Sequence, residues 1–161
     1  MLNHNKSLFS SLICVSSLNI FSLQPVIAAE SPLVAQMHVY EIVDAKKQIK
    51  TELRPETQVK PNSTLEYKVN YSNRSMNSLK GLKLNLPIPE HVSYMGTALP
   101  QNVYASTDGV NFAKAPLTHM VDGKKTLVPL QQYRVLQWHV TELKPKQTIS
   151  VAAHVRVNAA E

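Results

Sequence analysis

Two pairs of neighbouring methionine and histidine residues, Met37-His38 and His119-Met120, are the side chains in this sequence best suited to chemistry. Imidazole nitrogen and thioether sulfur together bind copper(I), so these four residues give one hypothesis, a periplasmic copper-handling protein. Adjacent residues of a strand point to opposite faces, however, and each pair also fits a core methionine beside a surface histidine. Our main interpretation is therefore that the chain has no metal site, and the four residues are the alternative.

Three further residues carry the oxygen ligands that a calcium site needs: Asp108, Asn111 and Asp122. Calcium takes about six to eight oxygens, and an EF-type loop places acids at alternate positions. The sequence around Asp108 supplies too few acidic groups for such a loop. Turn formation explains these residues better.

Hydrolytic chemistry lacks its usual signals. The chain has no Gly-x-Ser-x-Gly motif of the kind that positions a nucleophilic serine. His91 is expected in a loop, and His139 and His154 on the polar faces of strands, where each would face solvent. The only cysteine, Cys14, falls in the N-terminal leader discussed next, so the remaining chain has no thiol for catalysis or for a disulfide. We predict that the protein is not an enzyme and uses no cofactor.

The N-terminal segment 1–29 has the features of a secretory signal peptide. One lysine precedes an apolar run over 8–27, and Val26-Ile27-Ala28-Ala29 offers small residues for cleavage. A transmembrane anchor is the alternative, but Asn19 and Gln24 interrupt the run and no basic stop signal flanks it. No second apolar stretch of spanning length follows. We expect a periplasmic or secreted protein with no membrane span in the mature chain.

The rest of the chain, 30–161, alternates apolar and polar residues with a period of two, which is typical of strands with one buried face. The clearest runs are Leu65–Tyr71, Leu82–Leu86, Leu136–Val140 and Ile149–Val157. Weaker strands are expected at Val34–Val43, Ile49–Leu53, Val92–Ala98, Val103–Ser106 and Leu127–Leu130. Asp108-Gly109 and Asp122-Gly123 are hairpin signals between such runs.

This pattern predicts one all-β domain, an immunoglobulin-like antiparallel β-sandwich of about seven to nine strands. Trp138 is expected to be its core aromatic residue. The 161 residues carry a net charge of +6, but no stripe of Lys and Arg stands out, so nucleic acid is not an expected partner.

The order of these motifs over residues 34–158 resembles a bacterial family of conserved surface repeats, named domain of unknown function eleven. The matching segments are Thr64–Asn73, Leu82–Pro89, Val92–Thr97, Tyr104–Phe112, Leu136–Trp138 and Ile149–Val157. Lys146 stands where the family's closing turn usually has glycine, so we expect a different turn there. The resemblance implies an immunoglobulin-like sandwich outside the cytoplasmic membrane, and the family has no established active site to carry over.

We therefore expect a non-enzymatic interaction or structural module of the bacterial cell envelope, with an unknown ligand. Binding would use loops at one end of the sandwich, or pairing of an edge strand with a partner chain. The expected partner is a protein or another envelope component, and the oligomeric state stays open.

Overall fold

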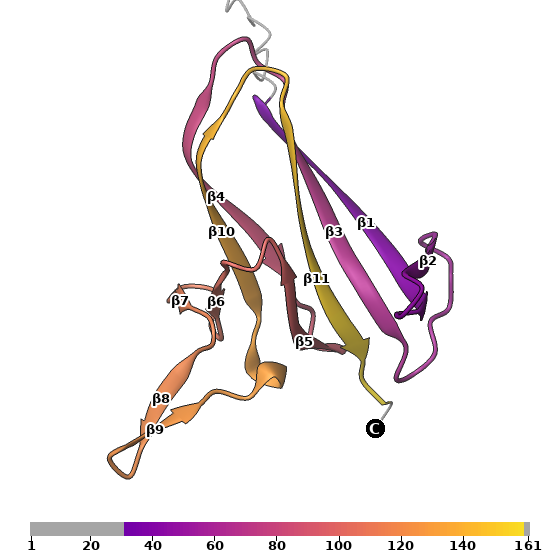
Figure 1. The fold of residues 1–161 in the computed structure, drawn as a ribbon, viewed down its shortest axis with the longest axis vertical. Coiled ribbons are helices and arrows are strands. Elements are labelled where there is room, and N and C mark those ends of the chain that lie inside the picture. The colour runs from indigo at the N-terminus through magenta and orange to yellow at the C-terminus, as the bar shows by residue number, and fades with distance from the viewer. Residues whose placement is uncertain (1–30, 160–161) are drawn as a thin grey trace, which may run out of the picture. The chain divides into compact units, whose positions relative to one another are not determined.

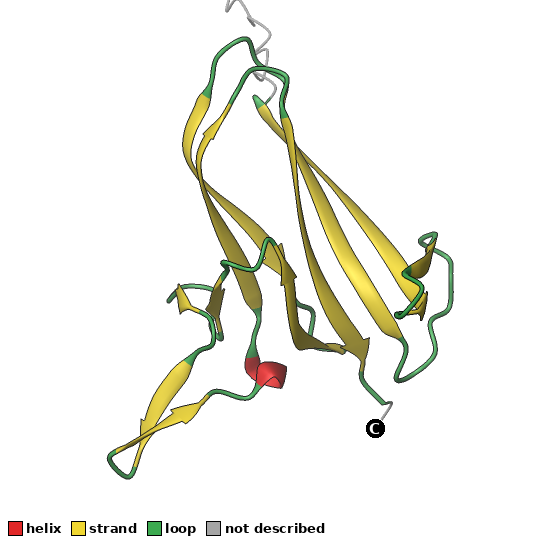
Figure 2. Ribbon diagram, in the orientation of Figure 1, coloured by secondary structure: helices red, strands yellow, loops and turns green. Residues whose placement is uncertain are grey.

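The computed structural model describes residues 31–159, and the expected signal peptide over 1–29 lies outside this part. The described chain consists of strands and a single 3-10 turn, η1 (Leu130–Gln132), which confirms the predicted all-β class (Figure 2). Within it, no helix has the length and apolar character needed to cross a membrane.

Five antiparallel strands form the larger sheet, which we call sheet A. In spatial order they are β2 (Ile49–Glu52), β1 (Leu33–Asp44), β3 (Thr64–Asn73), β11 (Thr148–Val157) and β5 (Val92–Leu99). Sheet B has four strands in the order β4 (Leu79–Pro87), β10 (Val135–Leu143), β6 (Tyr104–Ser106) and β7 (Ala113–Lys114). The long strands of the two sheets lie on opposite sides of the domain in Figure 1.

The two remaining strands, β8 (Thr118–Val121) and β9 (Lys124–Leu127), pair only with each other. They form a two-stranded ribbon that projects away from both sheets (Figure 1). All eight of its strand residues are exposed. We call this element the β8–β9 ribbon.

The core forms between the sheets because each long strand presents its apolar residues to one side. On β3 the alternate residues from Leu65 to Tyr71 are buried, while Lys68 and Asn70 between them are partly exposed. Trp138 of β10 is only 3% exposed, which confirms its predicted place in the core. Burying a side chain of this kind stabilises the fold by roughly 1.5–3 kcal/mol. The Tyr71 hydroxyl also links the sheets by donating a 2.6 Å hydrogen bond to the Asn85 carbonyl of β4.

Residues 31–159 form eleven strands where about seven to nine were expected. The predicted strand at Leu127–Leu130 is wrong: β9 ends at Leu127, and Leu130 begins η1. The Asp122-Gly123 turn, with φ of 49° and 75°, instead folds β9 back on β8 earlier in the chain. The sequence did not predict β7 and β8, because all of their side chains are exposed. A strand with no buried face has no reason to alternate apolar and polar residues.

The turn before β11 contains Lys146 in an unusual backbone conformation. Its backbone has φ of 61°, in the left-handed region that favours glycine. The Lys146 ammonium donates a 2.6 Å hydrogen bond to the Arg74 carbonyl across the neighbouring turn.

Candidate functional site

Sheet A leaves part of β1 without a neighbouring strand. β2 pairs with β1 only over Tyr40–Asp44, and one further bond joins the Leu53 N–H to the Val39 carbonyl at 2.8 Å. No strand in the described part of the chain pairs with Leu33–His38 on that side. We call Leu33–His38 the free edge.

The main-chain groups of the free edge point outward in a regular pattern. N–H and C=O groups of an antiparallel strand alternate in direction from one residue to the next. Because the Val39 carbonyl points toward the β2 side, Leu33, Ala35 and Met37 point their N–H and C=O groups to that side as well. Three residues therefore offer unpaired donors and acceptors to an added strand.

The outer strands of sheets A and B in residues 31–159 carry features that discourage strand pairing, and the free edge does not. β4 has Lys80 and ends at Pro87, and β5 is interrupted by an irregular register near Gly96, where η1 packs against it. β2 and β7 have only four and two residues. The segment 33–37 contains no charge, no proline and no bulge. Natural sheets usually guard such an edge.

A groove of about 590 Å³ lies beside the free edge, with an apolar wall on the core-facing side of sheet A and a polar rim that contains Glu52 and Arg54. Its apolar wall includes Met37, Val39, Leu53, Val59, Leu65 and Tyr67. Met37 shares this face with buried Val69, its partner on β3, yet Met37 is 49% exposed. An added strand would point alternate side chains toward this groove, next to Met37.

Two polar pairs on the outer face of sheet A hold β2 in place beside β1. The free edge begins where β2 ends. Glu66 of β3 is only 7% exposed and accepts a 2.6 Å hydrogen bond from the Lys50 ammonium of β2. The His154 imidazole lies 3.6 Å from the other Glu66 carboxylate oxygen. His38 and Glu52 form the second pair, with Nδ1 and Oε1 2.6 Å apart. These contacts hold β2 against one half of β1 only.

The structure does not bring the two Met–His pairs together. Met37 and His38 lie on opposite faces of β1, and His38 is bonded to Glu52. His119 and Met120 lie exposed on the β8–β9 ribbon, on the far side of the domain from β1 (Figure 1). Among the described residues, no cluster of three or more His, Cys, Asp or Glu side chains is placed to hold a metal ion. The four-residue copper hypothesis therefore gains no support from the geometry.

The turn interpretation of Asp108 is confirmed. Its Oδ1 accepts hydrogen bonds from the N–H groups of Asn111 and Val110, at 2.7 and 2.8 Å, and from the Ser106 hydroxyl at 2.8 Å. These bonds, with the Asn111 N–H as the strongest influence, hold the pKa of the Asp108 carboxyl below its usual range. Asp122 lies instead at the tip of the β8–β9 ribbon.

The three histidines considered for catalysis lie in three different elements, the loop before β5, β10 and β11. His91 is exposed in the loop before β5, as expected. His139, also exposed, stacks on the Tyr104 ring with centroids 4.1 Å apart. His154 is partly buried beside Glu66, which differs from the solvent-facing position that we expected. In the described part of the chain, none of them bonds to a serine hydroxyl.

Comparison of the chain with protein-family models, with curated proteins and with solved structures found no match. The resemblance to bacterial surface repeats therefore stays a prediction that depends on the order of short motifs. The free edge was missed because strand pairing between distant segments decides which edge is left open. Glu66 was missed because a polar residue on a strand's outer face looks the same in sequence whether it is solvated or bonded to Lys50.

Proposed function

We propose that this protein is a non-enzymatic interaction module of the bacterial cell envelope, exported to the periplasm or beyond. In this proposal it binds an extended segment of another polypeptide alongside the free edge of β1. The observation that carries the proposal is the uncharged, unguarded edge over 33–37 beside a groove with an apolar wall. The signal-peptide pattern over 1–29 and the resemblance to surface repeats support the location.

The free edge favours a particular kind of partner segment. The unpaired main-chain groups of Leu33, Ala35 and Met37 supply affinity that does not depend on the partner's sequence, as in other cases of strand addition. The groove beside Met37 then selects apolar residues at alternate positions of the partner strand. Since the edge carries no charge before His38, the central part of the partner segment should be uncharged as well.

Site-specific photo-crosslinking in the bacterium tests this proposal. A benzophenone amino acid would replace Gln36, whose exposed side chain lies in the middle of the free edge, and, in a matched control, Lys83 on the exposed face of β4. We expect discrete adducts from position 36 and none of the same mass from position 83. Sequencing of the adducts by mass spectrometry identifies the partner segment.

A second substitution distinguishes strand pairing from non-specific adhesion of other chains near position 36. Ala35→Pro removes the outward N–H without breaking a β1–β3 hydrogen bond, and Ala35→Ser keeps that N–H as the control. We expect the position-36 adducts to be lost in Ala35→Pro and kept in Ala35→Ser. Absence of adducts at position 36, or their survival in Ala35→Pro, contradicts the proposal. Adducts that contain β1 of a second copy would mean self-association and also contradict binding of a different chain.

A further inference from the structure

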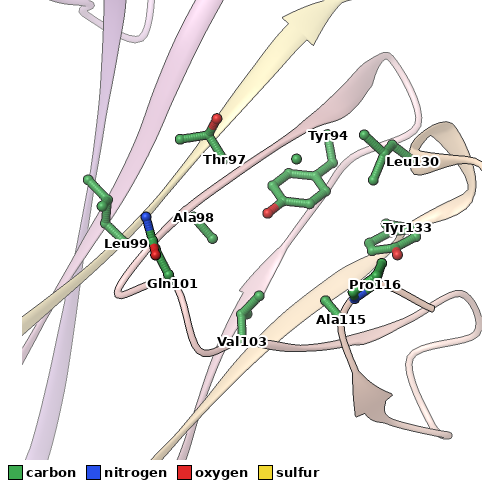
Figure 3. Close-up of a pocket in the computed structure, with 11 residues that line it drawn as sticks. Tyr94, Thr97, Ala98, Leu99, Gln101, Val103, Ala115, Pro116, Leu130 and Tyr133 are labelled. Carbon is green, nitrogen blue, oxygen red and sulfur yellow. The ribbon is translucent and has the colours of Figure 1, made fainter.

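A second hollow lies at the opposite edge of sheet A, beside β5 (Figure 3). It has a volume of about 330 Å³ and is bounded by β5, the loop from Leu99 to Val103, the Ala115-Pro116 segment and η1 with Tyr133. None of the eleven residues that line it carries a charge. We call it the Tyr94 pocket.

The walls of the Tyr94 pocket are held in place by hydrogen bonds and ring stacking. The Tyr94 and Tyr133 rings stack with centroids 5.7 Å apart, and the Tyr133 hydroxyl accepts a 2.7 Å hydrogen bond from the Leu117 N–H. On the opposite wall, the Trp138 indole N–H donates a 2.7 Å bond to the Pro100 carbonyl. Because these contacts already fix the walls, ligand binding costs them little further conformational entropy.

One polar group in the pocket has no protein partner within residues 31–159. Tyr94 as a whole is only 5% exposed. Its hydroxyl makes no hydrogen bond to any residue in the part of the chain that the structure describes, and it is not one of the fully buried polar atoms there, so it can be reached from the pocket. Figure 3 shows this hydroxyl on the Ala98 side of the Tyr94 ring, away from Tyr133 and Pro116. Burial, and secondarily Tyr133, raise the pKa of Tyr94 to about 12, so the hydroxyl is neutral and able both to donate and to accept.

We propose that the Tyr94 pocket binds an uncharged small molecule with an apolar, ring-sized body and one oxygen that hydrogen-bonds to the Tyr94 hydroxyl. The Tyr94 hydroxyl is open to the pocket and has no protein partner among the described residues, so a ligand oxygen can bond to it in place of water. A charged ligand would lose its hydration without gaining a counter-charge, because the lining supplies none. The site is independent of the free edge, since β1 and β5 lie in different parts of sheet A.

Binding of three matched probes tests the proposal: 4-methylphenol, toluene, which lacks the oxygen, and 4-methylbenzoate, which is charged. The purified protein labelled with nitrogen-15 would be titrated by NMR. Trp138 is the only tryptophan, so its single indole N–H signal reports on the Pro100 wall. We expect saturable shifts at Ala98, Val103 and this indole with 4-methylphenol, and binding of 4-methylbenzoate at least about tenfold weaker.

Tyr94→Phe removes only the hydroxyl and keeps the ring. We expect it to weaken 4-methylphenol about 5-fold and to leave toluene unchanged, the effect of one hydrogen bond. Tyr104→Phe, on the outer face of sheet B, is the matched control and should change the affinity for neither 4-methylphenol nor toluene. Absence of saturable shifts with 4-methylphenol, equal binding of 4-methylbenzoate, or an equal loss of both neutral probes in Tyr94→Phe overturns the proposal.

Discussion

The indole N–H of Trp138 donates a 2.7 Å hydrogen bond to the carbonyl of Pro100, in the loop that follows β5. A core side chain of sheet B thereby positions a surface loop attached to sheet A. The bond links the stability of the sandwich to the shape of the Tyr94 pocket, because Leu99 and Gln101 on either side of Pro100 line that pocket.

Trp138→Phe should destabilise the domain by about 2–3 kcal/mol. The substitution leaves the Pro100 carbonyl without its donor and removes part of a side chain that is 97% buried, as its exposed fraction is 3%. Urea denaturation followed by far-UV circular dichroism measures the change in the free energy of unfolding. Thr141→Val, an exposed position on the same strand, should stay within about 0.5 kcal/mol of the wild type. Equal stabilities of Trp138→Phe and the wild type would refute a structural role for the bond.

Asn73→Ala should cost about 2–4 kcal/mol. Asn73 is 1% exposed, and its side-chain amide donates to the carbonyls of Asn77, Leu143 and Lys144, at 2.7, 3.0 and 3.1 Å. Its removal leaves carbonyls of two turns unpaired near the end of β3. Asn70→Ala on the partly exposed face of the same strand is the control, with an expected loss below about 1 kcal/mol. Thermal or urea unfolding measures the free energy of unfolding of both variants. Similar losses of stability in Asn73→Ala and Asn70→Ala would contradict a special role for the buried Asn73 amide.

Lys146→Gly should stabilise the domain by about 1 kcal/mol. The lysine holds φ of 61°, a conformation that costs a residue with a Cβ roughly 1–2 kcal/mol and costs glycine little. Part of the gain is offset by loss of the bond from the Lys146 ammonium to the Arg74 carbonyl. Lys146→Ala loses that bond but keeps the Cβ, and should therefore be no more stable than the wild type. A glycine variant that is no more stable than the alanine variant would rule out backbone strain at this turn.

Tyr94 should make the domain sensitive to alkali. Burial raises its pKa in the folded state to about 12, above the ordinary value of 10.0, so its contribution to stability is complete below pH 10 and is lost as the pH rises toward 12. Unfolding then releases protons, and Tyr94→Phe should release about one proton fewer. Urea midpoints measured from pH 9 to pH 12 show this as a shallower decline in the variant. Parallel curves for the two proteins would contradict the raised pKa.

The sequence was sufficient to predict the strands that have a buried face. Alternation from Leu65 to Tyr71 reports one-sided burial directly, and the same holds for the run that contains Trp138. The same sequence pattern could not predict the β8–β9 ribbon, because an exposed hairpin has no buried apolar face that alternation would reveal. Lys146 shows a similar limit, since tertiary contacts can impose a backbone conformation that the residue type disfavours.

Neither candidate site could be predicted from residue types. The free edge exists because β2 is short and pairs with only one end of β1, and only the folded sheet fixes that register. The Tyr94 pocket combines β5 with residues as distant as Pro116 and Tyr133. Tyr94 looks like an ordinary core aromatic in the sequence, and its free hydroxyl becomes visible only when every neighbour has been placed.

The β8–β9 ribbon meets the rest of the domain through two adjoining residues at its base. Val128 donates to the Leu117 carbonyl at 2.9 Å, and the Leu117 N–H donates to the Tyr133 hydroxyl. Because the strand residues beyond this base are exposed, their side chains are under little constraint from folding. The sequence of the β8–β9 ribbon can therefore change, by evolution or by grafting a foreign epitope, while the sandwich that displays it stays the same.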